Sequence, residues 1–340
     1  MDPLERRTLG RTGVALTQLG LGGASMGELF RFVPEEDAVA TVRTAWDSGI
    51  RYFDTAPWYG RGLSELRMGA GLRGRPRDEC VVSTKVGRWL RASPDPAFST
   101  APWTGGTPFE VVFDYTYDGI MRSHEQSQLR LGLARIDLAV IHDLDHLYHG
   151  GGARLDGYFG QLATSGWRAL EELRRTGSLR AVGAGINDRG LIPRFLDLVD
   201  LDYFLVAMPY TLLDQEVLDD EFPACVARGI GFVIGSPFAS GILATGPVDG
   251  ATYAYAPASP AMVEKTGAIA AVCARYDVPL AAAALQFPLG HPAVASVIPG
   301  ASQPAHVQRN LAGFRHPIPA ALWADLKHER LLRDDAPVPV

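Results

Sequence analysis

The sequence predicts an α/β fold, a (β/α)8 TIM barrel with long loops on its C-terminal face. Short apolar strands alternate with amphipathic helices along the chain, which is typical of a parallel sheet covered on both faces. Eight such strands can be counted, and no linker or charge block divides the 340 residues. A closed barrel is therefore favoured over an open sheet, and we expect residues 1–340 to form one domain.

The expected strands are short, mostly apolar runs. They cover residues 16–21, 50–54, 80–84, 136–141, 179–184, 203–207, 231–234 and 294–298. The helix before the second strand begins near Pro34 with an acidic first turn, repeats apolar residues at helical spacing, and ends at Gly49. Further helices are expected over residues 123–133 and 165–175, before the fourth and fifth strands.

Two long loops interrupt this rhythm. Residues 87–116 are rich in Pro, Trp and Phe, and residues 143–164 contain three consecutive glycines. Both follow strands, so in a barrel both lie on the C-terminal face, where active sites are built. Loops of this length are usually functional, and we expect them to shape a substrate pocket.

Composition and charge exclude several classes of protein. The chain has 32 Lys and Arg against 38 Asp and Glu, a net charge of −6, which argues against a nucleic-acid partner. The long uncharged stretches, residues 229–248 and 278–305, are broken by Gly, Pro and Ser, so no membrane association is expected. No secretory signal is visible, and the three scattered cysteines form no CxxC pair. We expect buried thiols in a cytoplasmic protein.

Polar residues of unusual type occur where successive strands end. Asp54 closes one strand, Lys85 the next and His142 the one after, while Tyr59 lies on the loop that follows Asp54. A free tyrosine has a pKa of about 10, and an adjacent ammonium group lowers it. We therefore expect Lys85 to lower the pKa of Tyr59, so that the phenol exchanges a proton with an oxygen on a reacting carbon. No side chain supplies hydride, so a redox cofactor is required.

These residues lie in a series of motifs that resembles the aldo-keto reductases, nicotinamide-dependent barrel enzymes. The resemblance runs from about residue 7 to residue 310 and beyond. It rests on Leu9-Gly10-Arg11-Thr12-Gly13, Phe53-Asp54-Thr55-Ala56-Pro57-Trp58-Tyr59-Gly60, Ser64-Glu65, Ser83-Thr84-Lys85, Ile136-Asp137-Leu138 and Ile298-Pro299-Gly300. It implies an N-terminal β-hairpin, and a catalytic set of Asp54, Tyr59, Lys85 and His142 with Tyr59 as general acid or base.

Within this family, further motifs are similar to those of bacterial aldose 1-dehydrogenases of the fucose and D-threo-aldose type and of pyridoxal 4-dehydrogenase. They include Phe113-Asp114-Tyr115-Thr116, His142-Asp143-Leu144-Asp145 and Tyr210-Thr211-Leu212-Leu213-Asp214-Gln215. The resemblance implies an oxidoreductase that acts on a small aldose, lactol or aldehyde. A pyridoxal-type or general aldehyde reductase is the alternative.

The resemblance also implies where the cofactor binds. Its phosphates meet the loops after the seventh and eighth strands, residues 235–241 and 300–310. The expected cofactor residues are Gly23, Asp54, Asn187, Ser236, Phe238, Gly241, Gly300, Ser302, Gln303 and Asn310. Two residues that usually contact the cofactor in this family are replaced. Ala207 stands near the position of the usual glutamine, and Gly235 stands at the position of the aromatic residue that stacks on the nicotinamide.

The eighth loop bears on the choice of cofactor. Members that prefer NADP carry Lys-Ser and an Arg at places where this chain has Gly300, Ala301 and His306, although Arg309 is close in sequence. A 2′-phosphate needs Lys or Arg partners. We therefore predict NAD, with NADP as the alternative.

Other readings of the same residues stay open. Trp58 and Trp89 are candidates for a substrate-stacking wall, against simple loop packing. Three histidines and two aspartates over residues 142–149 have spacings that suit a metal, but the segment runs into glycines and we expect no metal. The alternative functions are a cofactor-binding regulatory subunit without turnover and a class I aldolase with a Schiff base on Lys85.

Overall fold

A computed structural model describes residues 1–95 and 97–339. Eight parallel strands form the central sheet in the order β14-β11-β10-β9-β8-β5-β4-β3. Parallel bridges from Leu19 to Val297 and from Gly22 to Gly300 join the first and last strands, so the sheet is a closed barrel. The strands are β3 (Leu21–Gly22), β4 (Tyr52–Asp54), β5 (Val81–Val86), β8 (Leu138–Ile141), β9 (Ala181–Ile186), β10 (Tyr203–Val206), β11 (Gly231–Gly235) and β14 (Val294–Ile298).

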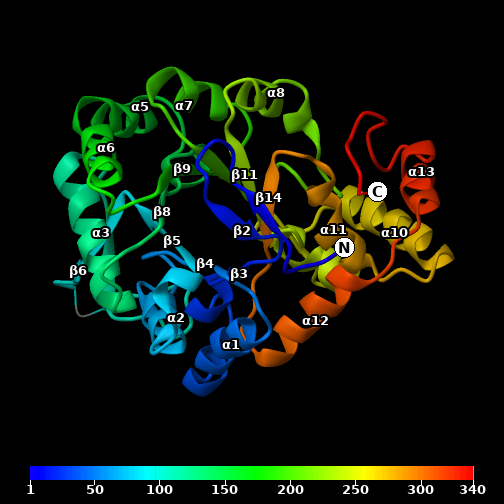
Figure 1. The fold of residues 1–340 in the computed structure, drawn as a ribbon, viewed down its shortest axis with the longest axis horizontal. Helices are drawn as coiled ribbons and strands as arrows, with labels where there is room; N and C mark the ends of the chain where they lie inside the picture. Colours follow the sequence, from blue (N-terminus) through cyan, green and yellow to red (C-terminus); the bar gives the residue numbers. More distant parts are fainter. Residues whose placement is uncertain (96, 340) are drawn as a thin grey trace.

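Helices surround this barrel, as Figure 1 shows. Their apolar faces and the outward-facing strand residues form one large core, because a strand presents alternate residues to opposite faces. The helices are α1 (Glu35–Asp47), α2 (Leu63–Leu72), α3 (Tyr117–Leu131), α4 (His146–His149), α5 (Ala153–Gln161), α6 (Trp167–Arg175), α7 (Ile192–Leu198), α8 (Glu221–Val226), α9 (Ile242–Thr245), α10 (Pro260–Arg275), α11 (Leu280–Gln286), α12 (Pro304–Arg315) and α13 (Ala320–His328).

An antiparallel hairpin of β1 (Arg6–Thr8) and β2 (Ala15–Thr17) closes one end of the barrel, and Figure 1 shows it crossing the front. Its apolar residues, Leu9 and Leu16 among them, pack on the inward-facing strand residues. The expected strand over residues 16–21 was therefore wrong as a single unit: Leu16 and Thr17 belong to the hairpin, and only Leu21 lies in β3.

The two segments expected to be loops contain regular structure. Residues 87–116 hold an antiparallel ribbon of β6 (Arg88–Ala92) and β7 (Phe109–Phe113), with Pro96 outside the described residues. Residues 143–164 are mostly helical, because Leu155, Phe159 and Leu162 recur on one face and are buried. A π-helical turn (Leu162–Gly166) joins α5 to α6, so the helix expected from residue 165 begins earlier.

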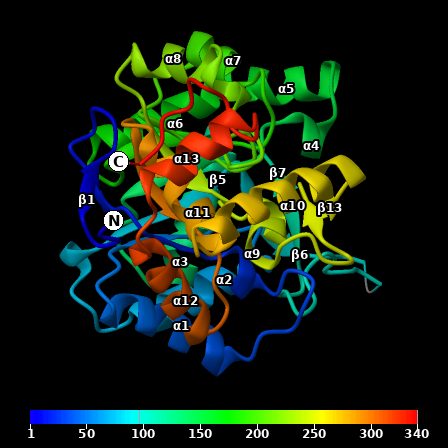
Figure 2. The same cartoon turned by 90° about the vertical axis from the view of Figure 1, so that its right-hand side faces the viewer.

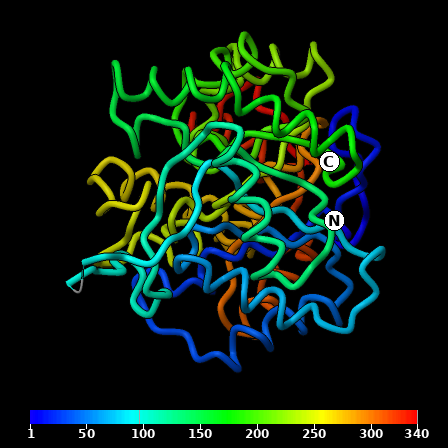
Figure 3. The backbone as a smooth tube through the Cα atoms, turned by 90° about the vertical axis from the view of Figure 1, so that its left-hand side faces the viewer, coloured from blue at the N-terminus to red at the C-terminus, as the bar shows by residue number. Residues whose placement is uncertain are grey.

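The helix expected over residues 123–133 also begins earlier, at Tyr117. The Thr116 side chain accepts a hydrogen bond from the Gly119 amide, which caps this helix. In Figures 2 and 3, the β6–β7 ribbon projects at the end of the barrel opposite the N-terminal hairpin. A small hairpin of β12 (Thr252–Tyr253) and β13 (Ala256–Pro257) lies at that same end.

Within the described residues, no single helix has the length and apolarity needed to cross a membrane. One pair bent by 99°, Pro260–Arg275 with Leu280–Gly290, passes that test by length and composition only.

Candidate active site

A cavity of about 380 Å³ opens at the C-terminal mouth of the barrel. Asp54, Tyr59, Lys85 and His142 all lie on its wall. Aromatic side chains from the surrounding loops line the rest, which makes the cavity mostly apolar around a few polar groups. They are Phe30, Trp58, Trp103, Tyr148, Phe238 and Tyr255.

Strand periodicity explains why three of these polar residues meet. Alternate residues of a strand face the same way, and Tyr52 and Val140 belong to the cluster inside the barrel. Asp54 and His142, each two residues further along, therefore face inward one layer above them. Strands β4, β5 and β8 are neighbours in the sheet, so Lys85 at the end of β5 lies between the other two.

Lys85 and Asp54 form a buried ion pair, each side chain about 2% exposed. The Lys85 Nζ donates hydrogen bonds to Asp54 Oδ1 at 2.6 Å and to the Thr55 carbonyl at 2.9 Å. The Ser83 hydroxyl donates to Asp54 Oδ2 at 2.6 Å. The ammonium group is thus fixed in position, and Lys85 is not presented as a free amine for Schiff-base chemistry.

Tyr59 lies on the tight turn after β4, where its ring contacts both cationic and imidazole groups. The Lys85 Nζ lies 4.6 Å from the centre of the phenol ring. The His142 ring lies edge-on to it, with ring centres 5.8 Å apart and planes at 89°. Gly27 allows this turn to approach, because a Cβ there would come within 2.5 Å of the Tyr59 carbonyl carbon.

Burial sets the ionisation of this site. It raises the pKa of Tyr59 well above its usual value, and the nearby Asp54 carboxylate raises it further. The expectation of a lowered pKa for Tyr59 is wrong, because desolvation of the phenolate dominates. Burial lowers the pKa of His142 well below its usual value, and Arg88 and Lys85 lower it further. Tyr59 is therefore a phenol and His142 a neutral imidazole.

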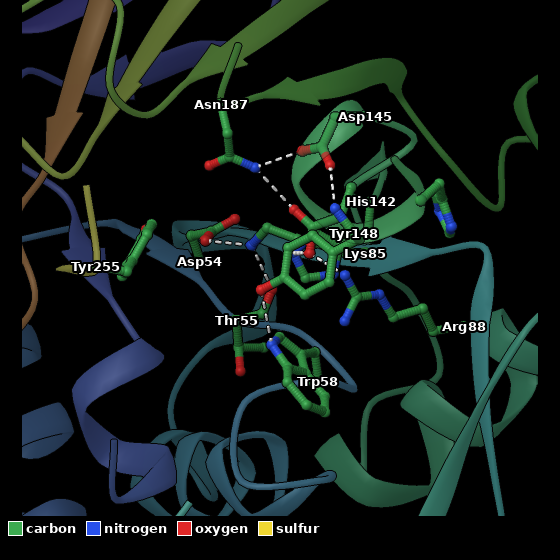
Figure 4. Close-up of polar contacts among 12 residues, drawn as sticks. Asp54, Thr55, Trp58, Lys85, Arg88, His142, Asp145, Tyr148, Asn187 and Tyr255 are labelled. Carbon is green, nitrogen blue, oxygen red and sulfur yellow. Dashed lines mark hydrogen bonds and ion pairs between the residues drawn. The ribbon is translucent and has the colours of Figure 1, made fainter. Parts of the chain in front are cut away.

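A second polar network begins beside His142. Its Nε2 lies 3.2 Å from Asp143 Oδ2, and Arg88 donates to that same oxygen. Asn187, which follows β9, donates from Nδ2 to Asp143 Oδ1 at 3.0 Å and to Asp145 Oδ2 at 2.8 Å. Because carboxylates only accept, the amide orientation is fixed. Figure 4 shows the Asn187 oxygen pointing away from Asp145.

The structure brings together most of the residues expected from the sequence. Besides the four residues above, those on the cavity wall are Gly23, Trp58, Asn187, Ser236, Phe238, Gly241 and Gly300. Ser302, Gln303 and Asn310 do not line it. Ser302 is buried and accepts from Arg31, Gln303 immediately precedes α12, and Asn310 lies within that helix.

Trp89 also lies away from the cavity. On β6 its indole nitrogen is 3.4 Å from Asp114 Oδ2, and the Arg122 guanidinium lies over its ring. This placement speaks against the substrate contact expected for it. The neighbouring Arg88 is the buried residue instead, because side chains alternate along the ribbon.

Sequence reasoning missed several residues of the site. Arg88, Tyr148 and Tyr255 come from segments read as loops, so no periodicity marks them, whereas Trp103 is a further candidate for a stacking wall by sequence and does line the cavity. One signal was present for Tyr148: Asp145 caps the short helix α4 by accepting from the Tyr148 amide. A helix start within residues 143–149 could have been read from that spacing.

The histidine cluster does not converge. His146 is half-exposed near Asp188, and His149 lies 3.2 Å from the Tyr115 hydroxyl. Within the part of the chain that the structure describes, no three His, Cys, Asp or Glu side chains are arranged to hold a metal ion.

Comparison with known proteins adds to this geometry. The model of the aldo/keto reductase family matches residues 18–328. The chain is 42% identical to pyridoxal 4-dehydrogenase of Microbacterium luteolum, over 96% of this chain and 98% of that protein. It is 41% identical to D-threo-aldose 1-dehydrogenase of a Pseudomonas species, over 94% and 96%. An aldo-keto reductase of Bacillus halodurans in its holo form superposes with a TM-score of 0.73 at 25% identity, over 99% and 98%.

Proposed function

Because the chain belongs to the aldo/keto reductase family, and is thus an NAD(P)-dependent oxidoreductase, we propose that it oxidises small cyclic hemiacetals. The names of its two close relatives specify pyridoxal and aldoses. Both compounds close on themselves, through their own hydroxyl groups, to rings that carry a hemiacetal hydroxyl. Oxidation of that hydroxyl gives a lactone. The observation that carries the proposal is the Tyr59, Lys85, Asp54 and His142 assembly on one cavity wall.

The residues of the chain divide the reaction between them. A bound oxidised nicotinamide would supply the acceptor for the hydride of the hemiacetal carbon. Tyr59 would first lose its own proton to water and would then, as the phenolate, accept the proton of the hemiacetal hydroxyl. A C–H and an O–H bond break and a C=O bond forms. Lys85 lies where its charge stabilises the phenolate that must accept this proton. In the reverse direction the raised pKa keeps Tyr59 protonated as an acid.

His142 orients the substrate oxygen. Its Nε2 lies 3.2 Å from Asp143 Oδ2. Among the described residues Nδ1 is buried and has no hydrogen-bond partner. The lowered pKa keeps the imidazole neutral, and we propose that Nε2 is the nitrogen that bonds the substrate oxygen.

The residues present fit a nicotinamide. Asn187 offers a fixed acceptor oxygen for a carboxamide, because its amino group is held by Asp143 and Asp145. Ser236 and Gly241 line the same cavity from the loop after β11. We propose these residues, with Gly23, Phe238 and Gly300, as the cofactor site. Ser302, Gln303 and Asn310 do not line the cavity, so they would contact the cofactor only if it extended beyond the cavity.

We propose NAD as the preferred cofactor. Gly300, Ala301 and His306 provide no cation for a 2′-phosphate. Arg31, however, donates to Ser302 Oγ at 2.7 Å. Burial lowers the pKa of His306, and the nearby charges of Arg309 and Arg31 lower it further. The kcat/KM values for NAD and NADP test this preference. A large advantage for NADP that Arg31→Ala removes would contradict it.

Turnover tests the proposal directly. Pyridoxal and L-fucose with NAD, and propanal with NADH, are followed by the absorbance of reduced nicotinamide. We expect Tyr59→Phe to reduce kcat by at least about a hundredfold, since general acid–base catalysis contributes that much. The matched control is Tyr255→Phe, which also loses a cavity hydroxyl but one whose sole hydrogen-bond partner among the described residues is Ser236. Full turnover by Tyr59→Phe would contradict the mechanism.

The three cysteines are free and buried. They support a reducing, cytoplasmic environment as part of this proposal.

A further inference from the structure

A second cavity, of about 320 Å³, adjoins the first beneath the β6–β7 ribbon. We call it the side pocket. Trp58 and Tyr148 line both cavities and form their common wall. The Trp58 indole nitrogen donates to the Tyr148 hydroxyl at 3.2 Å, so one hydrogen bond between side chains closes this wall. Rotation of either side chain would join the two cavities.

Arg88 is the unusual residue of the side pocket. It is only 1% exposed, yet its Nε and Nη1 have no hydrogen-bond partner among the described residues. Buried donors without partners are costly, and each calls for an explanation. The remaining donor, Nη2, is bound to Asp143. Figure 4 shows Arg88 directed at Tyr148, with Asp54 and Asn187 on the other side of the tyrosine.

The surroundings of Arg88 select the chemistry of a ligand. The guanidinium carbon lies 4.3 Å from the Tyr148 ring centre, 4.5 Å from that of Phe113 and 5.1 Å from that of Trp58. The same three aromatic side chains line the side pocket, and aromatic walls suit the flat or C–H-bearing face of a ring. The two free N–H groups require acceptor oxygens.

The charges of the side pocket are partly compensated. Asp143 already compensates Arg88. Arg61 stacks over Trp58 and Phe98, and the Glu110 carboxylate lies on the same pocket. Hydrogen bonds from Ser93 and Arg91 lower the pKa of Glu110, so it is charged. Glu110 is paired with Arg91, so three cations share two carboxylates, and the hydrogen bonding of Arg88 rather than the net charge selects the ligand.

We propose that the side pocket binds the non-reacting end of the substrate, a ring whose hydroxyl oxygens accept from Arg88. This proposal rests on the proposed function and adds the substrate class: a hydroxylated ring, large enough to reach past Trp58 and Tyr148, in preference to a short aldehyde. Pyridoxal and aldoses share this chemistry, and the test distinguishes them.

Filling the side pocket tests the proposal without touching the ion pairs. Val111 lines the pocket from β7, and Val112 on the opposite face of that strand does not. We expect Val111→Phe to raise KM for pyridoxal, L-fucose or both about tenfold or more, as loss of hydrogen bonds to a charged donor predicts. The KM for propanal stays within twofold. Val112→Phe is the matched control and leaves all three KM values unchanged.

Arg88→Lys is the second variant, because it keeps the charge beside Asp143 but loses the planar pair of donors. We expect Arg88→Lys to raise KM for the ring substrates and to leave KM for propanal within twofold. If Val111→Phe does not fold, this variant tests the proposal in its place. Whichever ring substrate responds identifies the substrate class. Equal KM changes for propanal and both rings, or no change for any, would overturn the proposal.

Direct binding separates this inference from the proposed function. Pyridoxal binding to the protein is measured by calorimetric titration, which needs no turnover. If the wild-type protein turns over none of the three substrates, the proposed function fails. The side pocket then stands only if pyridoxal binds and Val111→Phe weakens it about tenfold, and it falls if binding is absent or unchanged.

Discussion

The buried pair of Lys85 and Asp54 makes a quantitative prediction about stability. Each side chain is about 2% exposed, so removal of one partner leaves the other charge unpaired away from water. Such a change costs about 3–5 kcal/mol, whereas removal of both charges is often close to neutral. We therefore expect Asp54→Asn and Lys85→Met each to lower the stability by about 3–5 kcal/mol. The double variant should lie within about 2 kcal/mol of the wild-type protein.

The neighbouring groups support this arithmetic. Ser83 loses its acceptor when Asp54 changes, but its hydroxyl also lies 3.1 Å from the Tyr52 hydroxyl, so it keeps a partner. Equilibrium urea unfolding of the four proteins gives the interaction energy, which we expect to exceed about 3 kcal/mol. In thermal unfolding each single variant should lose about 6–10 °C, at about 2 °C per kcal/mol for a large domain. Single variants that cost less than 1 kcal/mol each, or a double variant no more stable than either, would refute the reasoning.

Two further predictions concern ionisation and backbone packing. Burial raises the pKa of Asp145 to about 6, above its value in the unfolded chain, so the protonated carboxyl favours folding. The contribution of Asp145 to stability therefore falls as the pH rises from about 4 to about 6. Asp145→Asn should reduce the dependence of the melting temperature on pH over that range, and an unchanged dependence would contradict the prediction. Gly27→Ala should lower both kcat and the melting temperature, because its Cβ would meet the Tyr59 and Gly60 backbone at 2.5 Å. Gly157→Ala is the control: it lies on an exposed face of α5 with nothing within 4 Å of the new Cβ, and it should raise the free energy of unfolding by up to about 1 kcal/mol. Equal effects of the two variants would contradict this prediction.

The sequence allowed the barrel and the floor of the site to be predicted because both depend on short-range rules. Apolar runs marked the strands, and the strand ends located Asp54, Lys85 and His142 on neighbouring strands. The first strand was misjudged because the apolar run over residues 16–21 spans two elements that pair with different partners. The helical part of residues 143–164 was missed because its three glycines were weighted above the apolar spacing from Leu155 to Leu162.

What the sequence could not provide was the balance of burial and charge. The Tyr59 pKa depends on how completely the cavity excludes water, and this effect exceeds that of the Lys85 charge. Arg88 looks like an ordinary loop residue in the sequence, because only the packed ribbon shows that its guanidinium is enclosed. Trp89, beside it, looked the better candidate because aromatic residues so often contact ligands. The ribbon register assigns the two residues to opposite faces.

Asp143 connects these parts of the site. One oxygen accepts from Asn187, and the other faces both His142 and Arg88. It holds a left-handed backbone conformation with φ of 47°, which costs a non-glycine residue energy that the surrounding contacts must offset. Because the amide and the side-pocket guanidinium bond to this one carboxylate, and the imidazole lies 3.2 Å from it, a change at one of them disturbs the others. A substrate ring that engages Arg88 is thereby coupled to the imidazole that holds its reacting oxygen, and binding energy gained at the remote end can serve to position the reacting end.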